Sequence, residues 1–266
     1  MAEFEEDLKR SIDLAAELML KAKHVVGLTG AGVSVESGIR PFRGPGGLWT
    51  EYGEPPMDGY QRLLADPKRE WEKTVKREGY LKGFFEAFEN AKPNPGHYAL
   101  AELEQVGVLR FLITQNVDNF HRAAGNKNLA EIHGNLYLLR CISCNSRYPQ
   151  EEISLEELPP HCPKCGGIIK SDGVYFGEPI PSDILSKCQE EVYKCDCMLL
   201  AGTSGFVYPA AGFPRVVKQR GGTLLEVALY ETDLTYMCDV ILRGKSGEVL
   251  PELVNCIKSK MGIPRS

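Results

Sequence analysis

The stretch His24-Val-Val-Gly-Leu-Thr-Gly-Ala-Gly-Val-Ser-Val-Glu-Ser-Gly38 runs from a short apolar segment directly into closely spaced glycines. The apolar part, which ends at Thr29, is typical of a strand that is buried on both faces of a parallel sheet. Gly30 and Gly32 would let the backbone approach a pyrophosphate, while backbone N–H groups and a helix N-terminus offset its charge. The spacing is not Gly-x-Gly-x-x-Gly, so this turn alone suits a dehydrogenase or a purely structural turn equally well.

Further apolar runs alternate with helical stretches along the chain. This alternation predicts an α/β fold with a doubly wound parallel sheet. Two segments interrupt it: a Gly- and Pro-rich loop at 44–59 with charged helical sequence at 66–90, and a cysteine-containing segment at 140–170. Beyond the first strand, we expect strands at Val108–Thr114, Gly173–Phe176, Cys197–Ala201 and Thr223–Val227, and helices near 4–19, 98–105, 182–193 and 209–219.

Composition and charge are ordinary for a globular enzyme. The 266 residues are 43% hydrophobic and 25% charged, which suits one large domain or one domain with a smaller insertion. A net charge of -5 gives no electrostatic reason for nucleic-acid binding. No apolar run approaches the roughly 20 residues of a membrane span, and the acidic N-terminus lacks the apolar segment of a signal peptide. We therefore expect a cytoplasmic protein that binds neither nucleic acid nor membranes.

Four of the nine cysteines are spaced as a metal site. The pairs Cys141-x2-Cys144 and Cys162-x2-Cys165 are separated by residues 145–161, a spacing typical of a zinc ribbon. Each pair can place two thiolates about 2.3 Å from one tetrahedral ion, and four thiolates leave no coordination position open. We therefore predict one structural Zn²⁺, with disulfides or buried thiols as the alternative.

The remaining cysteines and His161 are expected to have no metal-binding role. His161 adjoins Cys162 but would find no vacant position on the ion, so we expect it on the solvated surface. Five cysteines show no comparable spacing, and we predict that they are thiols of the core. They are Cys188, Cys195, Cys197, Cys238 and Cys256.

A polar cluster, Thr114-Gln-Asn-Val-Asp118, follows a predicted strand. The amides of Gln115 and Asn116 both donate and accept, which suits a carboxamide such as nicotinamide, and Asp118 could accept from its N–H2 group. Capping of the helix that follows is the alternative, but it explains only one of these residues. His133 lies farther on, in Glu-Ile-His-Gly-Asn, and a lone histidine is more often structural than catalytic.

Taken in order, these segments resemble the sirtuins from about Val25 to Glu248. Each motif is modest by itself, but their joint occurrence in this order is specific to that family. The matching motifs are Gly30–Ile39, Phe42-Arg43-Gly44, Thr114–Asp118, His121, His133-Gly134, the four paired cysteines, Phe176-Gly177-Glu178 and Gly202-Thr203-Ser204.

The resemblance implies a Rossmann-like large domain and a small domain built from two insertions. The large domain would comprise about 1–43, 91–136 and 172–266, and the small domain a cofactor loop with helices at 44–90 and a zinc ribbon at 137–171. NAD and an acyl-lysine protein or peptide would meet in the cleft between them. Hydrolysis would yield free lysine, nicotinamide and an O-acyl-ADP-ribose.

The resemblance also implies roles for individual residues. His133 would be the general base, which takes a proton from the ribose hydroxyls once the acyl oxygen has displaced nicotinamide. Asn116 and Asp118 would act beside it and, with Ile39, would form the nicotinamide pocket. The other NAD contacts would come from Gly30, Ala31, Gly32, Ser37, Phe42, Arg43, Gln115, Gly202, Thr203, Ser204 and Ala228. The peptide would be clamped as an added strand by Gly173, Val174, Phe176, Gly177, Glu178 and Val207.

Three residues depart from the sirtuin pattern. Pro41 stands where the family usually has Asp or Thr, so it supplies no carboxylate for loop closure or cleavage. Ala228 replaces an asparagine, which would remove a ribose hydrogen bond and weaken NAD binding without abolishing activity. Gly173 replaces a bulky aliphatic residue of the acyl-lysine tunnel, and the helical insertion has no clear Tyr-x-x-Arg pair, the mark of desuccinylases. We therefore expect removal of acetyl and of longer, uncharged acyl groups.

Two other functions stay open at this point. Mono-ADP-ribosyl transfer to protein would use the same NAD site with a different acceptor. A catalytically silent NAD-binding regulatory module would suit Pro41 and Ala228, although binding alone has no need of a base at His133. A dehydrogenase is the weakest alternative. The physiological substrate is open, and we expect a monomer.

Overall fold

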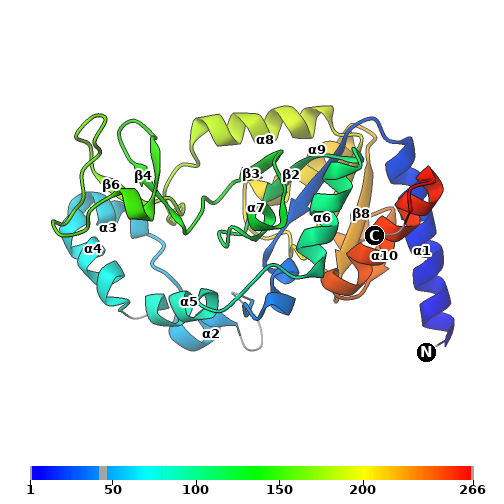
Figure 1. Cartoon of the computed structure of the whole chain (residues 1–266), viewed down its shortest axis with the longest axis horizontal. Coiled ribbons are helices and arrows are strands. Elements are labelled where there is room, and N and C mark those ends of the chain that lie inside the picture. The colour runs from blue at the N-terminus through cyan, green and yellow to red at the C-terminus, as the bar shows by residue number, and fades with distance from the viewer. Residues whose placement is uncertain (1, 42–46, 79, 265–266) are drawn as a thin grey trace.

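Two β-sheets organise the residues that the computed structural model describes, 2–41, 47–78 and 80–264 (Figure 1). The larger sheet has the strand order β3-β2-β1-β7-β8-β9, and each neighbouring pair is parallel. This arrangement confirms the predicted α/β fold with a Rossmann-like, doubly wound sheet. Its strands are β1 Val25–Thr29, β2 Leu109–Thr114, β3 Leu129–Glu131, β7 Cys197–Ala201, β8 Thr223–Ala228 and β9 Val240–Arg243.

Helices cover both faces of the larger sheet, which explains why its strands are apolar on both sides. Side chains alternate along a strand, so Val25 shares a core with α1, α6 and α10, whereas Val26 shares one with α8 and α9. These helices are α1 Ala2–Lys21, α6 Pro95–Gln105, α8 Ser182–Lys194, α9 Phe213–Gln219 and α10 Ser246–Met261. Within the described ranges, no helix is long and apolar enough to cross a membrane.

The smaller sheet is antiparallel, has the order β5-β4-β6, and lies at the opposite end of the molecule from the two termini (Figure 1). Trp71 of α4 donates its indole N–H to the carbonyl of Ile169 (2.7 Å) and packs in one core with Leu139. This contact joins the helical insertion to the cysteine-containing segment. The elements are α3 Gly59–Ala65, α4 Pro67–Lys76, β4 Leu138–Cys141, β5 Arg147–Pro149 and β6 Ile169–Ser171.

Short helices and 3-10 turns lie between the longer elements of both parts. Helix α2 lies in the segment 44–59, so the prediction of a loop without an element is wrong for its described part. Strand β9, with 4 residues, is not predicted because such a short run shows no period. The short helices are α2 Leu48–Tyr52, α5 Tyr80–Phe88, α7 Phe120–Ala124, and the 3-10 turns Ala31–Val33, Val35–Ser37, Gln150–Glu152, Ala210–Gly212 and Thr235–Met237.

The segment Gly173–Phe176 is not a strand, so that prediction is wrong. Val174 donates its backbone N–H to the carbonyl of His133 (2.9 Å), as a strand would. The chain then turns at Gly177, where φ is +79°, and cannot continue along the sheet. An apolar run therefore follows β6 without forming a ladder.

Candidate active site

Two glycine turns meet at the carboxyl ends of β1 and β7. Gly30 donates its N–H to the carbonyl of Ala201 (3.1 Å), and Gly32 donates to that of Gly202 (2.8 Å). A Cβ on Gly32 would lie 2.7 Å from the Cα of Gly202, so the turns pack this closely because glycine is there. The strand order reverses between β1 and β7, which is where open α/β sheets bind ligands. The two predicted glycine turns therefore form one site.

The amide cluster after β2 lies at the same edge of the sheet. Gln115 donates from Nε2 to Thr203 Oγ1 (2.8 Å), which links it to the second glycine turn. Asn116 donates from Nδ2 to the carbonyl of Gly30 (3.1 Å), which links it to the first. Three predicted site segments that are far apart in the sequence are thus joined by hydrogen bonds.

Ser34 is the buried centre of this cluster, and it is not among the predicted site residues. It is 1% exposed. Its hydroxyl donates to Asp118 Oδ2 (2.6 Å) and accepts from Asn116 Nδ2 (3.1 Å). The signal that could have identified Ser34 is its place in the first glycine turn, directly before the segment that leads to Ile39.

His97 of α6 also contacts Ser34, and the sequence offers no signal for it. Asn94 donates its backbone N–H to His97 Nδ1 (3.2 Å), so the neutral ring carries its proton on Nε2 and donates it to Ser34 Oγ (3.3 Å). Burial lowers the pKa of His97 to about 4, because the charged ring would be poorly solvated. Burial also raises the pKa of Asp118, which the bond from Ser34 opposes.

Buried His97 should make the fold sensitive to acid. Its pKa is about 4 in the folded chain, against an ordinary value of 6.5, so the unfolded state binds the extra proton as the pH falls between these values. The stabilisation of the fold by neutral His97 is fully present above pH 6.5, the ordinary pKa, and it is lost as the pH falls toward about 4, the pKa in the folded chain. We expect His97 to lower the free energy of unfolding by about 2 kcal/mol between roughly pH 7.5 and pH 5.

Urea denaturation of the wild type and His97→Gln at both pH values measures this contribution. The raised pKa of Asp118 acts in the opposite direction in both proteins and cancels in the comparison. The same pH dependence in the two proteins would show that His97 is not buried as a neutral ring.

His133 lies beside the amide cluster, directly after β3. Its Nδ1 is 3.0 Å from the carbonyl oxygen of Gln115, which can only accept, so Nδ1 carries the proton and Nε2 keeps a lone pair. Burial lowers the pKa of His133 below its usual value, although the bond to Gln115 opposes this shift. The ring is therefore neutral at physiological pH with one nitrogen able to accept a proton, as a general base must be.

The predicted peptide segment begins next to His133. Gly134 has φ +81°, and a Cβ there would lie 2.2 Å from the carbonyl oxygen of Asp172. The chain before Gly173 can therefore pack on the His133 loop only because Gly134 has no side chain. Gly173 itself borders open space, since the nearest atom to a Cβ there would be Ser171 Oγ at 3.8 Å.

Helix α3 holds the rest of the predicted peptide segment. Tyr60 donates its backbone N–H to the carbonyl of Phe176 (3.1 Å), and a Cβ on Gly177 would lie 2.7 Å from the side-chain oxygen of Gln61. The side chain of Glu178 is 3% exposed and is paired with buried cations. Glu178 can therefore contribute to a peptide site only through its backbone.

Ser37 and Ile39 follow the first glycine turn and border the Ser34 cluster. Ser37 Oγ accepts from Asn94 Nδ2 (2.9 Å). Ile39 is 3% exposed and shares a small core with Phe120. The ring of Phe120 in turn contacts that of His97, with centroids 5.4 Å apart.

Of the remaining predicted site residues, two lie near β7 and β8, and two lie outside the described residues. Ala228 ends β8, the strand next to β7, and is 6% exposed. Val207 follows the second glycine turn, and its carbonyl accepts from the backbone N–H of Ala211 (2.9 Å). Phe42 and Arg43 lie outside the described residues.

The four predicted metal ligands converge in the smaller sheet. Their sulfur atoms all lie within 4.8 Å of one another, with 3.5 Å between Cys141 and Cys165 and 3.7 Å between Cys144 and Cys162. A tetrahedron with Zn–S bonds of about 2.3 Å has edges of about 3.8 Å. A Cβ on Gly167 would lie 3.0 Å from Cys141 Sγ, so the turn beside the ligands needs glycine. The four thiols thus fit the predicted structural Zn²⁺.

The other thiols are partly as predicted. Cys188, Cys195 and Cys197 are buried, and burial raises the pKa of each thiol to about 12, as expected for thiols of the core. Cys238 and Cys256 are only partly buried, but both pack against the cores on the two faces of the larger sheet. His161 is exposed, as predicted, and its Nδ1 is 3.0 Å from the carbonyl of Gly166.

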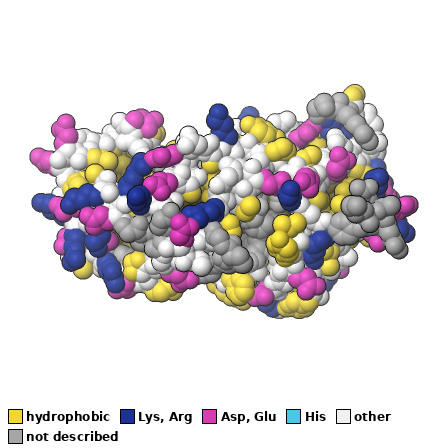
Figure 2. Space-filling view, turned by 90° about the horizontal axis from the view of Figure 1, so that it is seen from below, with side chains coloured by type: hydrophobic (Ala, Val, Ile, Leu, Met, Phe, Trp, Pro, Cys, Tyr) yellow, Lys and Arg dark blue, Asp and Glu magenta, His cyan; other side chains and the backbone are white. Residues whose placement is uncertain are grey.

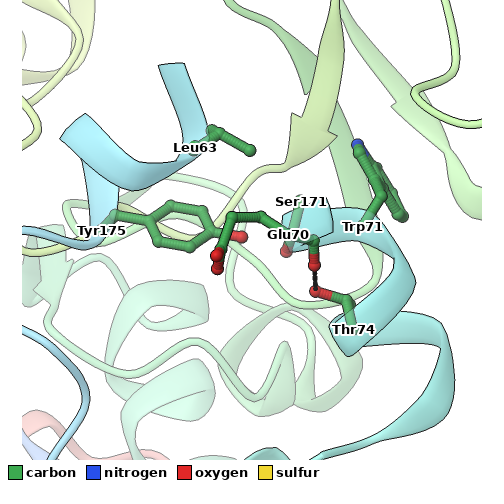
Figure 3. A pocket seen from close by; sticks show the side chains of 6 residues that line it. All are labelled: Leu63, Glu70, Trp71, Thr74, Ser171 and Tyr175. Atoms are coloured by element: carbon green, nitrogen blue, oxygen red, sulfur yellow. Dashed lines mark hydrogen bonds between the residues drawn. The ribbon is translucent and has the colours of Figure 1, made fainter. Parts of the chain in front are cut away.

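A small pocket lies between α4 and the chain around β6 (Figure 3). Its volume is about 10 Å³, which is room for about one water molecule. It is therefore too small for a dinucleotide or an acyl chain. Its lining residues are Leu63, Glu70, Trp71, Thr74, Ser171 and Tyr175.

Comparison with known proteins identifies the family. The chain matches the Sir2 family over residues 30–209. An NAD-dependent protein deacylase of Pyrococcus abyssi (strain GE5 / Orsay) is 43% identical over 248 residues, which cover 91% of this chain and 96% of that protein. A Sir2 homologue solved as an NAD complex has 43% identity and a TM-score of 0.77, and the match covers 92% of this chain and 93% of that one. A Sir2 protein bound to a myristoylated histone peptide has 34% identity and a TM-score of 0.68, with coverage of 95% and 98%. Because sequence, fold and site agree over most of its length, the chain belongs to the Sir2 family, the sirtuins.

Proposed function

We propose that this chain is an NAD-dependent protein lysine deacylase that removes acetyl and longer, uncharged acyl groups. The products are free lysine, nicotinamide and O-acyl-ADP-ribose. The observation that carries the proposal is His133, a neutral histidine whose Nδ1–H is bound to Gln115 and whose Nε2 can accept a proton at the edge where the glycine turns meet. The deacylase of Pyrococcus abyssi supports the same activity.

The glycine turns are proposed to hold the phosphates and adenosine ribose of NAD. Gly30, Ala31 and Gly32 present backbone at the end of β1, and Gly202, Thr203 and Ser204 do so at the end of β7. The N–H groups of Gly30 and Gly32 already donate to Ala201 and Gly202, so glycine at these positions serves the close approach of a pyrophosphate to the backbone. Ala228, on the neighbouring strand, would contact the same ribose without a hydrogen bond, and Ser37, Phe42 and Arg43 would complete the cofactor site.

The nicotinamide pocket is proposed to consist of Ile39, Asn116 and Asp118. Asn116 donates from Nδ2 to the carbonyl of Gly30 and to Ser34 Oγ, and these two bonds fix its side chain. Its Oδ1 can therefore accept a hydrogen bond from the carboxamide. Asp118 accepts from Ser34 Oγ at Oδ2 and from the backbone N–H of Phe120 at Oδ1. A carboxylate oxygen can accept a second bond, so Asp118 can also receive the carboxamide N–H2 group.

His133 is proposed to take a proton from a ribose hydroxyl after the acyl oxygen has displaced nicotinamide. Burial keeps the ring neutral, and the bond to Gln115 sets the tautomer. Gln115 would contact the same ribose. The acyl-lysine peptide would lie along Gly173, Val174 and Phe176–Glu178, with Val207 on the other side.

Nicotinamide release from NAD, with and without an acetyl-lysine peptide, tests the proposal. We expect release that depends on the peptide, together with equal amounts of deacylated peptide. Release with transfer of ADP-ribose to the protein or peptide would favour mono-ADP-ribosyl transfer instead. NAD binding with no release on acetyl, octanoyl or myristoyl peptides would favour a regulatory module.

Gly173 is proposed to make room for long acyl chains, because the space where its Cβ would point is open. In Gly173→Val the added Cβ would have no contact shorter than 3.8 Å, and we expect the variant to lower kcat/KM for a myristoyl peptide about tenfold relative to an acetyl peptide. Steady-state kinetics on both peptides measure the ratio. An unchanged ratio, or wild-type activity on myristoyl no higher than on acetyl peptides, would show that long chains do not pass this residue.

A monomeric state and a cytoplasmic location are also proposed. All nine cysteines are free thiols, and the two pairs at the metal site must stay reduced to bind zinc, which suits a reducing compartment. Light scattering of the purified chain tests the monomer, for which a mass of 29.5 kDa is expected.

A further inference from the structure

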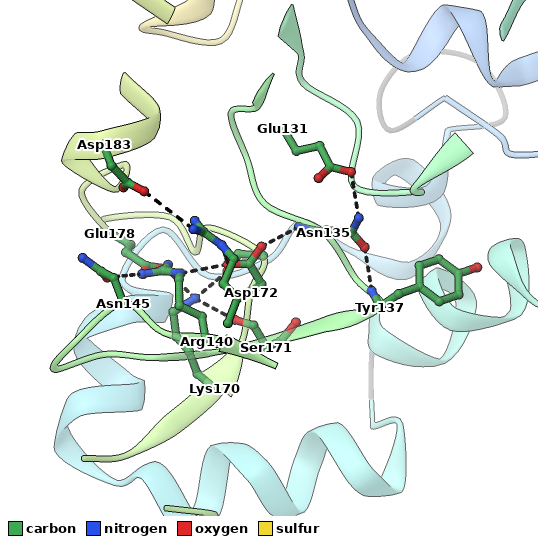
Figure 4. A network of polar contacts seen from close by, with 12 residues as sticks. Glu131, Asn135, Tyr137, Arg140, Asn145, Lys170, Ser171, Asp172, Glu178 and Asp183 are labelled. Atoms are coloured by element: carbon green, nitrogen blue, oxygen red, sulfur yellow. Dashed lines mark hydrogen bonds and ion pairs between the residues drawn. The ribbon is translucent and has the colours of Figure 1, made fainter. Parts of the chain in front are cut away.

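Four charged side chains are buried together where the smaller sheet meets the predicted peptide segment (Figure 4). The exposed fractions are 0% for the side chain of Lys170, 4% for Arg140, and 3% each for Asp172 and Glu178. We refer to these four residues as the ion cluster. Arg147, which is 27% exposed, contacts Asp172 at its rim.

Each charge in the ion cluster has a partner of opposite sign. Arg140 donates from Nε to Asp172 Oδ1 (3.0 Å) and from Nη2 to Glu178 Oε1 (2.6 Å). Lys170 Nζ is 3.0 Å from Glu178 Oε2 and also donates to the carbonyls of Ser171 (2.8 Å) and Gly173 (2.7 Å). The three N–H bonds of one ammonium are thus used by three acceptors of the segment 171–178. An apolar side chain could fill the space of Lys170 but could not donate hydrogen bonds to these three acceptors.

The ion cluster also holds backbone that leads to His133. Asp172 Oδ2 accepts the N–H of Asn135 (3.1 Å), and Glu178 Oε2 accepts the N–H of Tyr175 (2.9 Å). Between these points, Val174 donates to the carbonyl of His133 (2.9 Å). The His133 loop and the segment that follows β6 are therefore tied to each other and to the same buried charges.

The two cations, Arg140 and Lys170, lie in two strands of the smaller sheet, which also holds Cys141. Arg140 directly precedes Cys141 in β4 and is paired in register with Lys170 of β6, while Cys141 is paired with Ile169. A change in the pairing of these strands would move both cations. The ion cluster thus lies between the metal site and the candidate active site.

We propose that the ion cluster is a positioning device, in which Lys170 sets the geometry of the segment 173–178 and of the His133 loop from the zinc-binding sheet. Buried ion pairs contribute little net stability compared with apolar side chains of the same volume, so stability alone does not explain four such groups. Lys170 is a positioning residue, because it acts on the substrate through the backbone that it holds. The expected effect on the KM for peptide rests on the proposed function, whereas the expected effect on the backbone of these segments does not.

The test is the double variant Lys170→Met/Glu178→Gln, which removes one charge of each sign and leaves the Arg140–Asp172 pair intact. The matched control makes the same substitutions in the pair Lys187–Glu191 of α8, whose atoms are 2.7 Å apart. We expect the double variant to bind one zinc and to melt close to the wild type. Its KM for an acetyl-lysine peptide should rise about tenfold or more, while its KM for NAD changes less than about twofold. The control should resemble the wild type.

Hydrogen exchange provides a readout that needs no activity. In the double variant, we expect exchange in segments 133–136 and 172–178 to become about tenfold faster or more, with α10 unchanged. Wild-type exchange in these segments, or a wild-type KM for peptide in an active variant, would overturn the proposal. Loss of zinc or unfolding of the double variant would make the ion cluster a folding element and would also overturn it. If the wild type releases no nicotinamide, the proposed function fails, and the exchange comparison still decides the positioning role.

Discussion

His133→Ala is expected to form deacylated peptide about 10² to 10⁴ times more slowly than the wild type at saturating NAD. The reason is local: the imidazole is neutral, its Nδ1–H is bound to Gln115, and its Nε2 would be the proton acceptor in the proposed reaction. Alanine keeps the backbone bond from Val174 to residue 133, so the neighbouring segment should stay in place. Mass spectrometry of the peptide and chromatography of nicotinamide measure the two products together.

The matched control for this substitution is His24→Ala. His24 Nε2 is 2.7 Å from Glu191, so this ring is also held by a hydrogen bond, but His24 directly precedes the amino end of β1, and the candidate active site lies at the carboxyl end. We expect the control to keep wild-type turnover and both variants to keep wild-type affinity for NAD. Near wild-type turnover in His133→Ala would show that another group is the base.

The depressed pKa of His133 has a consequence for the same assay. A base with a lowered pKa stays unprotonated further into the acid range, so the acid limb of kcat/KM should lie below the ordinary histidine value of 6.5. A limb above that value would contradict the buried, neutral ring.

Removal of zinc is expected to unfold the smaller sheet and thereby to abolish deacylation. Structural Zn²⁺ in zinc-finger peptides contributes about 10–16 kcal/mol of apparent binding free energy, and this energy is folding energy. Without the ion, four thiols within 4.8 Å of one another lose their common partner, and the core that Trp71 shares with Cys141 and Cys162 should open. We expect a chelator, or Cys162→Ser, to expose Trp71 and to abolish deacylation.

Tryptophan fluorescence can follow this change at one residue. The chain has 2 tryptophans, so Trp49→Phe leaves Trp71 as the only emitter. Its emission should shift to longer wavelength on metal removal, because the indole loses its bond to the carbonyl of Ile169 and becomes hydrated. Cys256→Ser is the matched control, since that thiol lies in α10, outside the metal site. Unchanged emission and melting after chelation would show that the four thiols do not hold a structural ion.

Local patterns predicted the parts of the site that are encoded within a few residues. The Cys-x2-Cys pairs predict the ligands, because two thiolates in one turn already share most of the metal geometry. The first glycine turn is predicted because closely spaced glycines directly follow an apolar run, although the turn alone does not distinguish a cofactor site from a structural turn. The amide cluster at 114–118 is predicted because its amides suit a carboxamide, and because capping of the next helix explains only one of its residues.

Contacts between distant segments could not be predicted in this way. Ser34 carries no signal beyond its place in a turn, yet it joins Asn116 and Asp118, and His97 reaches it from another helix. The run at Gly173–Phe176 has the composition of a strand, but Gly177 turns the chain. Burial of Glu178 likewise follows from two cations on β4 and β6 that the sequence does not connect with it.

The sequence by itself determined the parallel α/β sheet, the zinc ligands, the two glycine turns and, through its motifs in order, the sirtuin family. Only the tertiary structure decided that His133 is neutral with its Nε2 left to accept a proton, that Ser34 and His97 contact the amide cluster, and that Lys170 and Arg140 are buried against the segment 171–178. The physical reason is the separation in sequence of the residues that set each property. Periodicity, turns and ligand spacing are set by neighbours along the chain, whereas burial, pKa and the partners of a polar group are set by residues that only folding brings together.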